Sequence, residues 1–266
     1  MGRKTGSSNK AKIARRVIEV LDFFDDDHRE ATVMDIVRRY NRPQSSTSEL
    51  LSSLVELGLL RKDPYSRAYS LTPRAALLGT AGQSEMVRDG RLVRLVDRLA
   101  SQLGLAVGLF AMVGTNAQIA AWRASARPSA SLDSMLGGMQ APLCDVAAGW
   151  AILSAIDGTR CEGIVRRLNA EASDGRKFIQ AEMMQHISDC REQRYAFGPA
   201  GFGSDAQMLG ALVPRQPETQ PLAIGIVYSH QDKVNPQGLL QAVSEAMRHC
   251  LPDHPERPVE KLPNAA

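Results

Sequence analysis

Several residue classes and motifs are scarce or missing in this 266-residue sequence. Aromatic residues make up 5%, and the four cysteines are scattered without a C-x-x-C pair: Cys144, Cys161, Cys190 and Cys250. Scattered thiols argue against a disulfide framework and are typical of reduced proteins of the cytoplasm. The longest apolar stretch, residues 103–113, is too short to cross a bilayer, and residues 1–16 lack the apolar segment of a secretory signal. We therefore expect a cytoplasmic protein with no membrane partner.

The motifs of common catalytic sites are also missing. There is no P-loop, no G-x-S-x-G turn and no H-E-x-x-H pair, and the five histidines do not share metal-ligand spacing with the cysteines. Residues 198–203 are glycine-rich like a nucleotide loop, but they follow a predicted helix and include Pro199, which favours an irregular pocket loop. We therefore expect no catalytic activity, no cofactor and no metal.

The charge of the sequence is small overall and uneven along its length. The net charge is +3, but residues 1–75 hold 14 Lys and Arg against 10 Asp and Glu, whereas the remainder holds 18 against 19. Six cations and no acid fall in residues 1–16: Arg3, Lys4, Lys10, Lys12, Arg15 and Arg16. Such a basic arm suits the phosphate backbone or minor groove of DNA, although a disordered solubilising tail has the same composition.

Residues 32–58 predict two helices joined by a short turn. In the first, apolar side chains recur at helical spacing: Val33, Ile36, Val37 and Tyr40. Pro43, followed by Ser46 and Glu49, predicts the start of the second helix with a capping box. This helix has an apolar face of leucines (Leu50, Leu51, Leu54 and Leu57) opposite a face of small polar side chains. A polar face of this kind fits the major groove of DNA.

The next segment predicts a basic β-hairpin. Residues 59–62 and 68–71 have the pattern of short strands, and residues 63–67 hold turn residues. Two helices followed by this hairpin make a winged helix-turn-helix, whose hairpin cations lie against phosphate. The alternative is a helical hairpin beside a small sheet with no DNA partner. The predicted DNA-binding residues are Gln44, Ser45, Ser46, Ser48, Glu49 and Ser52 on the polar face, with Arg42, Lys62 and Arg67 as the phosphate contacts.

The following residues predict a connector and a second domain. Residues 74–103 form a linker helix, interrupted near residues 79–82, whose apolar face serves either a dimer contact or packing on its own domain. Residues 104–251 alternate strands with helices, which predicts an α+β sheet. Residues 252–266 hold four prolines and predict a disordered tail.

Two segments of the second half resemble a known family. Residues 142–153 (P-L-C-D-V-A-A-G-W-A-I-L) resemble the P-L-x-x-x-A-x-G-x-A-x-L motif of IclR-family transcriptional regulators, and residues 209–213 (L-G-A-L-V) stand where that family has an I-A-A-P-V strand. The winged helix-turn-helix, the E-L-G turn at residues 56–58 and the linker are similar too, so the resemblance covers residues 10–251. It implies a GAF-like ligand-sensing domain, DNA binding as a dimer or a dimer of dimers, and control by a small metabolite, often an aromatic or organic acid.

The predicted architecture is α+β: a basic disordered arm (1–9), a winged helix-turn-helix DNA-binding domain (10–73), a linker helix (74–103), a GAF-like effector-binding domain (104–251) and a disordered tail (252–266). The predicted function is a transcriptional regulator that binds an inverted-repeat DNA operator as a homodimer, or as a dimer of dimers, under the control of a small-molecule effector. One alternative is a regulator whose C-terminal domain serves only oligomerisation or cysteine-based redox sensing. Another is an enzyme with an accessory winged domain.

The sequence departs from the family near the implied ligand pocket. The family's G-K is Gly149-Trp150 here, and its E-x-x-x-G is replaced by residues 201–205 (G-F-G-S-D). These changes favour a neutral or hydroxylated aromatic ligand over a simple dicarboxylate. The alternative is a pocket that has collapsed around Trp150 and binds nothing. Core packing is the alternative for Trp150 and Met135, and Cys144 is either a redox-sensing thiol or a small pocket-lining side chain. The predicted effector-binding residues are Met135, Met139, Cys144, Trp150, Phe202, Ser204 and Asp205.

Overall fold

Contacts between residues divide the chain into two units, Met1–Gln83 and Ser84–Ala266. The computed structural model describes residues 9–25, 28–126, 132, 135–214, 220–229 and 231–251. Apart from Asn9, where the first helix begins, the predicted arm lies outside the described residues, and so does the whole predicted tail. None of the described helices combines the length and apolar content needed to cross a membrane.

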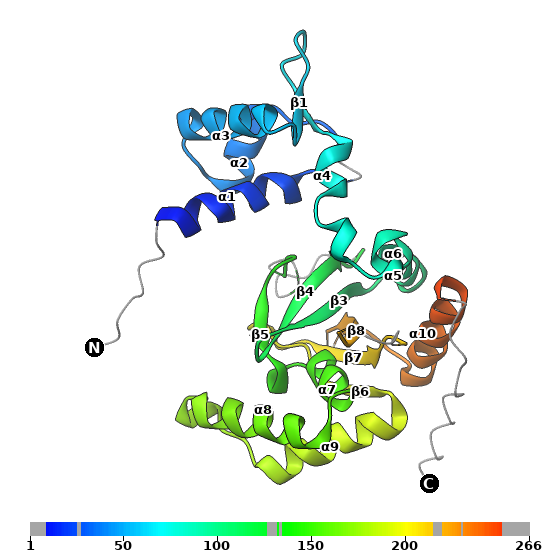
Figure 1. Ribbon diagram of the computed structural model, residues 1–266. Helices are drawn as coiled ribbons and strands as arrows, with labels where there is room; N and C mark the ends of the chain where they lie inside the picture. The colour runs from blue at the N-terminus through cyan, green and yellow to red at the C-terminus, as the bar shows by residue number, and fades with distance from the viewer. Residues whose placement is uncertain are drawn as a thin grey trace. The chain divides into compact units, whose positions relative to one another are not determined.

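The first unit is a group of helices followed by a short hairpin (Figure 1). Its elements are α1 (Asn9–Phe23), α2 (Val33–Tyr40), α3 (Gln44–Glu56), β1 (Leu60–Lys62), β2 (Tyr69–Leu71), α4 (Pro73–Leu77) and the 3-10 helix η1 (Thr80–Gly82). The two strands pair antiparallel, and Ala31 adds a bridge to Tyr69. The core of this unit includes Val20, Ile36, Leu51, Leu54 and Tyr69. The predicted helices and hairpin are confirmed in their predicted order.

Helix starts in this unit are set by local side chains. At the start of α2, the backbone N–H and the hydroxyl of Thr32 both donate to Asp35 Oδ2, at 2.8 and 2.7 Å. The capping box predicted for Ser46 and Glu49 is wrong, because α3 begins directly after Pro43 and the Ser46 hydroxyl donates to the Pro43 carbonyl. A capping box would make Ser46 the N-cap, three residues after the observed N-cap, Pro43.

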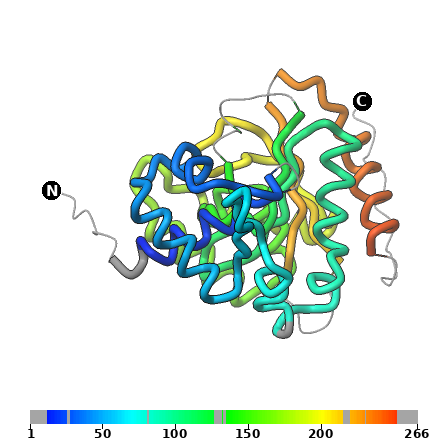
Figure 2. The backbone as a smooth tube through the Cα atoms, turned by 90° about the horizontal axis from the view of Figure 1, so that it is seen from above, coloured from blue at the N-terminus to red at the C-terminus, as the bar shows by residue number. Residues whose placement is uncertain are grey.

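The second unit is a six-stranded antiparallel sheet with helices on both faces (Figures 1 and 2). Its strands are β3 (Ala106–Val113), β4 (Asn116–Arg123), β5 (Gln140–Pro142), β6 (Tyr195–Pro199), β7 (Gln207–Leu212) and β8 (Leu222–Tyr228), in the order β5-β4-β3-β8-β7-β6. Its helices are α5 (Glu85–Arg88), α6 (Arg91–Leu103), η2 (Leu143–Asp145), α7 (Ala147–Ser154), α8 (Gly158–Glu171), η3 (Asp174–Arg176), α9 (Gln180–Gln193) and α10 (Pro236–Cys250).

Two apolar cores lie on the two faces of this sheet. One core joins the sheet to α7, α8 and α9, and the other joins it to α6 and α10. Successive residues of β3 alternate between them: Leu109 belongs to the α6–α10 core and Phe110 to the α7 core. In this unit the sheet therefore separates two layers of helices, with α7, α8 and α9 on one face and α6 and α10 on the other.

Two glycines allow α7 to approach its neighbours closely. A Cβ added at Gly149 would lie 2.1 Å from the Leu143 carbonyl oxygen, and one added at Gly210 would lie 2.6 Å from backbone atoms of Ala147 and Ala148. Both contacts are with backbone, which cannot move aside as a flexible side chain does. This close approach holds η2 and α7 against β7.

The predicted linker helix is not continuous. Gly79 and Gly90 adopt positive φ angles of 79° and 74° and separate α4 from α5 and α5 from α6. On α6, Leu95, Val96 and Leu99 are fully buried in the core shared with the sheet and α10. Of the two alternatives for the apolar face, packing on its own domain is therefore correct.

Three further elements of the second unit differ from the predicted ones. β5 and β6 were not predicted, because both are short edge strands that contain proline, a residue that sheets tolerate at edges. Residues 198–199, predicted as part of an irregular loop, end β6. The helix predicted to start at Cys144 starts at Ala147, after the 3-10 turn of η2.

Candidate nucleic-acid interface and ligand cavity

The outer face of α3 is polar and opposite its buried side. On the buried side, Leu51 and Leu54 are each 1% exposed. The helix contains no Lys or Arg on any face. Among the predicted residues of the outer face, Ser48 is half-buried and the other four are exposed: Gln44, Ser45, Glu49 and Ser52. Hydroxyl, amide and carboxylate groups all hydrogen-bond base edges. The surface therefore has groups that read bases, while any cations that bind phosphate must come from other elements.

Two of the predicted DNA-binding residues have partners within the unit. Arg42 Nη2 donates to both carboxylate oxygens of Glu19, at 2.7 and 3.0 Å. The Ser46 hydroxyl accepts a hydrogen bond from Arg16 Nη2 at 3.2 Å. Both interactions join α1 to the α2–α3 turn and the start of α3. In this conformation Arg42 neutralises a carboxylate of its own unit.

The hairpin between β1 and β2 is built by one aspartate. Asp63 Oδ1 accepts hydrogen bonds from the backbone N–H groups of Tyr65 and Ser66, both at 2.8 Å, and from the Ser66 hydroxyl. These bonds stabilise the carboxylate and lower the pKa of Asp63. Tyr65, at the tip, is 95% exposed. A rigid loop of this kind presents its neighbouring side chains in a fixed arrangement.

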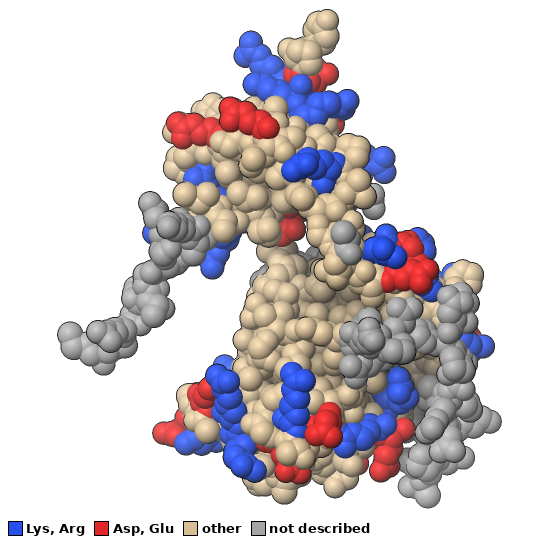
Figure 3. Space-filling view, in the orientation of Figure 1, with Lys and Arg blue, Asp and Glu red and all other residues tan. Residues whose placement is uncertain are grey.

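Cations surround this hairpin. Arg61, Lys62 and Arg67 are all exposed, and Lys62 Nζ lies 5.3 Å from the centre of the Tyr69 ring. Lys and Arg side chains gather around the hairpin of the first unit in the space-filling view (Figure 3). The sequence analysis named Lys62 and Arg67 as phosphate contacts but missed Arg61, whose positive charge beside Lys62 in the predicted strand was a usable signal. The polar α3 face, which lacks Lys and Arg, and the basic hairpin together have the properties of a DNA-binding surface.

The predicted effector-binding residues are mostly core residues. Met135, Cys144 and Trp150 are buried in the α7 core, and Met139 and Phe202 pack against it. Phe202 lies 5.9 Å from Phe110, measured between ring centres. Of the two polar members, the Ser204 hydroxyl accepts from Ala206 N–H at 3.0 Å, and Asp205 is exposed. The structure thus brings five of the seven together in one apolar cluster.

Trp150 has specific contacts within this core. Its indole N–H donates to the Cys144 carbonyl at 2.8 Å, and its ring stacks on His186 at 5.0 Å with an 8° interplanar angle. A Cβ at Gly198 would lie 2.6 Å from the indole ring, so glycine at this position of β6 makes room for it. These contacts favour the core-packing interpretation of Trp150.

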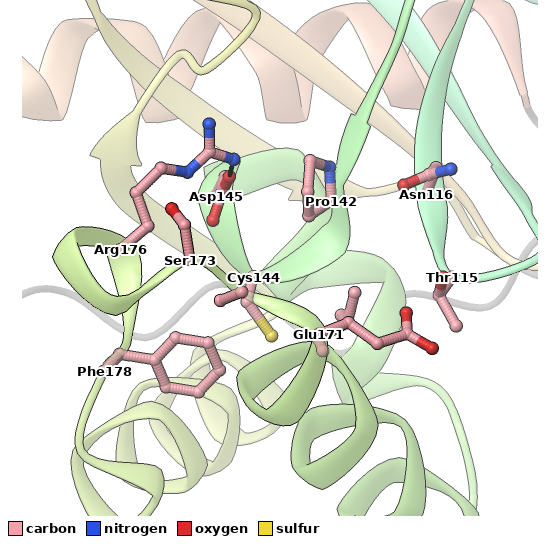
Figure 4. Close-up of a pocket in the computed structure, with 11 residues that line it drawn as sticks. Thr115, Asn116, Pro142, Cys144, Asp145, Glu171, Ser173, Arg176 and Phe178 are labelled. Atoms are coloured by element: carbon pink, nitrogen blue, oxygen red, sulfur yellow. Dashed lines mark hydrogen bonds and ion pairs between the residues drawn. The ribbon is translucent and has the colours of Figure 1, made fainter. Parts of the chain in front are cut away.

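A cavity of about 310 Å³ lies at another place in the second unit (Figure 4). Its lining comes from the β3–β4 turn, from β5 and η2, and from α8 with the segment that follows it. The polar lining residues are Thr115, Asn116, Cys144, Asp145, Glu171, Ser173 and Arg176. The apolar ones are Pro142, Leu168, Ala172 and Phe178. Only Cys144 was among the predicted effector-binding residues.

Ion pairs and reciprocal hydrogen bonds fix the cavity walls. Arg176 Nη2 lies 2.6 Å from Asp145 Oδ2, which joins η3 to η2. Asn169 and Phe178 exchange two hydrogen bonds, side-chain amide to backbone, at 2.8 and 3.0 Å. The Leu143 N–H donates to the Thr115 carbonyl at 3.1 Å. Segments far apart in sequence are thereby held around one space.

Three cysteines of this unit, Cys144, Cys161 and Cys190, are buried. Burial raises the pKa of Cys144 to about 12 and that of Cys190 to about 11, and it also raises the pKa of Cys161. Because a redox-sensing cysteine needs thiolate character, the buried environment disfavours that alternative for Cys144. Among the described residues, no group of three or more His, Cys, Asp or Glu side chains is placed to hold a metal ion.

Most cavity residues were missed by the sequence analysis. Thr115, Asn116, Glu171, Arg176 and Phe178 come from a turn, a helix end and a connecting segment. No periodicity or motif distinguishes such positions from ordinary surface residues.

Comparisons with known proteins agree with this architecture. Residues 14–64 match the model of the IclR helix-turn-helix domain. Over 180 residues the chain is 26% identical to a protein named Pca regulon regulatory protein, from Pseudomonas putida. That alignment covers 68% of this chain and 61% of the relative, so the chain matches less than two thirds of the relative's length.

Solved structures share the fold over nearly the whole chain. An IclR homologue of Microbacterium hydrocarbonoxydans, solved in complex with 4-hydroxybenzoate, superposes with a TM-score of 0.56 at 16% identity, covering 91% of this chain and 98% of that one. A regulator from Alicyclobacillus acidocaldarius gives 0.55 at 18% identity, covering 90% and 96%. The predicted fold class, a winged helix-turn-helix followed by a GAF-like α+β domain, is confirmed.

Proposed function

We propose that this chain is a transcriptional regulator of the IclR family, that it binds a double-stranded DNA operator and that a small-molecule effector controls this binding. The observation that carries the proposal is the helix-turn-helix of residues 14–64, whose α3 face is polar and open and whose hairpin is basic. Its place of action is the cytoplasm, where bacterial DNA lies, and its role is regulation without catalysis.

In the proposed complex α3 enters the major groove. Gln44, Ser45, Ser48, Glu49 and Ser52 face the bases, and Lys62 and Arg67 of the hairpin bind phosphates. Arg61 joins these cations because it is exposed on the same hairpin. Arg42 reaches phosphate only if it leaves Glu19, and Ser46 contributes by orienting the start of α3.

The proposed active form is a homodimer or a dimer of dimers. A single α3 without long cationic side chains has few strong contacts to offer, and two copies double them. The operator is then an inverted repeat whose half-sites lie about one helical turn apart, roughly 34–36 Å.

The proposed effector is a small aromatic or other organic acid. One solved structure with the same fold holds 4-hydroxybenzoate, which supports this class. Met135, Met139, Cys144, Trp150, Phe202, Ser204 and Asp205 remain the candidates that the family resemblance indicates.

Fluorescence anisotropy with labelled DNA from upstream of the chain's own gene tests the proposal. We expect binding at least about a thousandfold tighter than to a scrambled duplex, and a shift in affinity when 4-hydroxybenzoate or a related acid is added. Light scattering of the DNA-binding species should give two or four times the 28.9 kDa mass of one chain. Equal affinity for the operator and the scrambled duplex would contradict the proposed function.

A further inference from the structure

We propose that Tyr65, at the tip of the β1–β2 hairpin, is a specificity-determining residue that enters the minor groove of DNA and selects A·T over G·C base pairs there. This inference rests on the proposed function, because it assigns a second base-reading element to the same DNA-binding unit. The proposed base contacts described above all lie on α3, and the hairpin supplied only phosphate contacts. Tyr65 therefore extends the recognised sequence beyond the bases that α3 reaches.

The loop that carries Tyr65 is held in place by hydrogen bonds of its own backbone. Asp63 N–H donates to the Ala68 carbonyl at 2.8 Å, and Arg67 N–H donates to the Asp63 carbonyl at 3.0 Å. Asp63 Oδ1 accepts from the backbone N–H groups of Tyr65 and Ser66, both at 2.8 Å. The backbone at Tyr65 is thereby fixed before DNA arrives, so little conformational entropy is lost there on binding.

The Tyr65 side chain contributes almost nothing to the fold. It is 95% exposed, whereas Tyr69 in β2 is 1% exposed and belongs to the core of the unit. The two tyrosines of the hairpin thus have different roles, one in the core and one in solvent. A large, flat and amphipathic ring on a rigid loop can bury nearly its whole surface against a partner.

The charges around the tip favour DNA as that partner. Arg61, Lys62 and Arg67 are exposed, and the Asp63 carboxylate accepts three hydrogen bonds within the loop. In the space-filling view, Lys and Arg side chains gather below the outer end of the hairpin, which is tan (Figure 3). If two copies of the chain met at these tips, their cations would come together, and the like charges would oppose the contact. A polyanion meets no such barrier.

The order of residues along the hairpin places its tip at the minor groove. Arg61 and Lys62 belong to β1, and Tyr65 lies beyond them in the loop. With α3 in the major groove, these cations reach the phosphates at its edge, and the same row of phosphates borders the minor groove. The chain from Lys62 to Tyr65 spans at most about 10 Å. That reach is sufficient for the tip to enter a groove about 6 Å wide.

The chemistry of a tyrosine side chain favours A·T pairs in this groove. A·T and T·A pairs present only the acceptors adenine N3 and thymine O2, whereas a G·C pair adds the guanine amino group. The phenol hydroxyl donates to such an acceptor, and the ring fills the space that the amino group would occupy. A·T-rich segments also have a narrow groove with a strong negative potential, which attracts the neighbouring Arg67.

Fluorescence anisotropy with base analogues in the operator tests the proposal in the full-length protein. Replacing adenine by 2,6-diaminopurine, in turn at each A·T pair flanking a half-site, adds a minor-groove amino group and leaves the major-groove pattern unchanged. At the position that Tyr65 contacts, we expect the wild-type Kd to rise about five- to tenfold. In Tyr65→Ala the change should be less than about twofold, and the salt slope should equal that of the wild type because tyrosine is uncharged. Tyr65→Phe should keep part of the discrimination, because it keeps the ring.

Arg61→Ala is the matched control, since Arg61 is an exposed cation of the same hairpin. Its loss should weaken binding to modified and unmodified duplexes by the same factor and reduce the salt slope by about one unit. Circular dichroism verifies that each variant is folded. Discrimination in Tyr65→Ala equal to that of the wild type would overturn the proposal, as would a wild-type protein that tolerates diaminopurine at every flanking position.

Duplexes without an operator separate this inference from the proposed function. Alternating inosine·cytosine DNA has the major-groove pattern of G·C and the minor-groove acceptors of A·T. A protein with no operator specificity that binds this duplex more tightly than alternating G·C, and loses the preference in Tyr65→Ala, supports the inference and contradicts the function. Specific operator binding with no Tyr65-dependent preference in either assay overturns the inference and leaves the function standing.

Discussion

The two units hold their candidate functional residues in opposite ways. In the first, the candidates come from one stretch, residues 42–67, and most lie exposed on a helix face and a hairpin. In the second, the cavity draws on residues 115–178 from several separate segments, and the apolar cluster around Trp150 is buried. The candidate DNA-binding surface is formed by residues that are close together in the sequence. The cavity, in contrast, forms only after segments that are distant in the sequence have packed together.

This difference determines what a substitution does. Side chains on the open face of α3 support little of the core, so their loss should change binding and leave the free energy of unfolding nearly unchanged. Side chains around α7 are packed on all sides, so their loss should change stability first. Four measurements, from the largest expected effect to the smallest, sharpen or break this contrast.

Trp150→Ala should have the largest effect. The side chain is 8% exposed, stacks on His186 and donates to the Cys144 carbonyl, so truncation removes packing and leaves a buried carbonyl without its donor. We expect a loss of about 3–5 kcal/mol of unfolding free energy in urea denaturation. Tyr65→Ala, at the exposed hairpin tip, is the control and should change stability by under about 0.5 kcal/mol. Similar losses in the two variants would break the contrast.

Gly149→Ala should destabilise the second unit through a backbone clash. Its Cβ would lie 2.1 Å from the Leu143 carbonyl oxygen, and relief requires α7 or η2 to shift, at a cost of roughly 1–3 kcal/mol. Gly163 lies within α8 and has no atom within 4 Å of an added Cβ. Gly163→Ala should therefore stabilise by about 0.5–1 kcal/mol through helix propensity. Thermal unfolding of both variants should show shifts of opposite sign.

Glu49→Ala and Arg67→Ala should separate base reading from phosphate binding. Loss of Arg67 should weaken binding to all sequences and reduce the slope of log affinity against log salt by about one unit. Loss of Glu49 should change the preference at one base pair by about 1–3 kcal/mol with the salt slope unchanged. Competition with operator variants at several salt concentrations measures both. If Arg67→Ala changes base preference while Glu49→Ala does not, the roles are reversed.

Thr32→Ala should have the smallest effect, and that effect should depend on pH. Hydrogen bonds from the Thr32 hydroxyl and N–H lower the pKa of Asp35 from its ordinary value of 3.8. A lowered folded-state pKa means that the stabilisation is present above pH 3.8 and is lost as pH falls through the lower value. Because Asp35 is 42% exposed, we expect the substitution to cost about 1 kcal/mol or less at neutral pH. The difference from wild type should shrink in acid, whereas Ser52→Ala, as control, should show no such trend.

The sequence predicted the first unit well for a physical reason. Helical periodicity in residues 32–58 and turn residues at 63–67 encode α2, α3 and the hairpin within short stretches, so their polar face follows directly. Even there, Arg42 was predicted from its charge alone, and only the fold brings Glu19 within 2.7 Å of it.

In the second unit the order of most strands and helices, and the resemblance of residues 142–153 to a family motif, were accessible from sequence. The partners of those residues were not. Trp150 was predicted either to line a ligand pocket or to pack in the core, and only the fold brings its ring against His186 of α9 and into the space beside Gly198 of β6.

By itself, the sequence determined which faces are apolar, where helices and turns fall, and which family the chain resembles. The tertiary structure decided what covers each apolar face: α6 packs on its own sheet, and Cys144 becomes a buried, protonated thiol. It also placed Arg176 of η3 within ion-pair distance of Asp145 of η2. Periodicity is a local property of the chain, whereas burial, pKa and cavities depend on which distant segments meet.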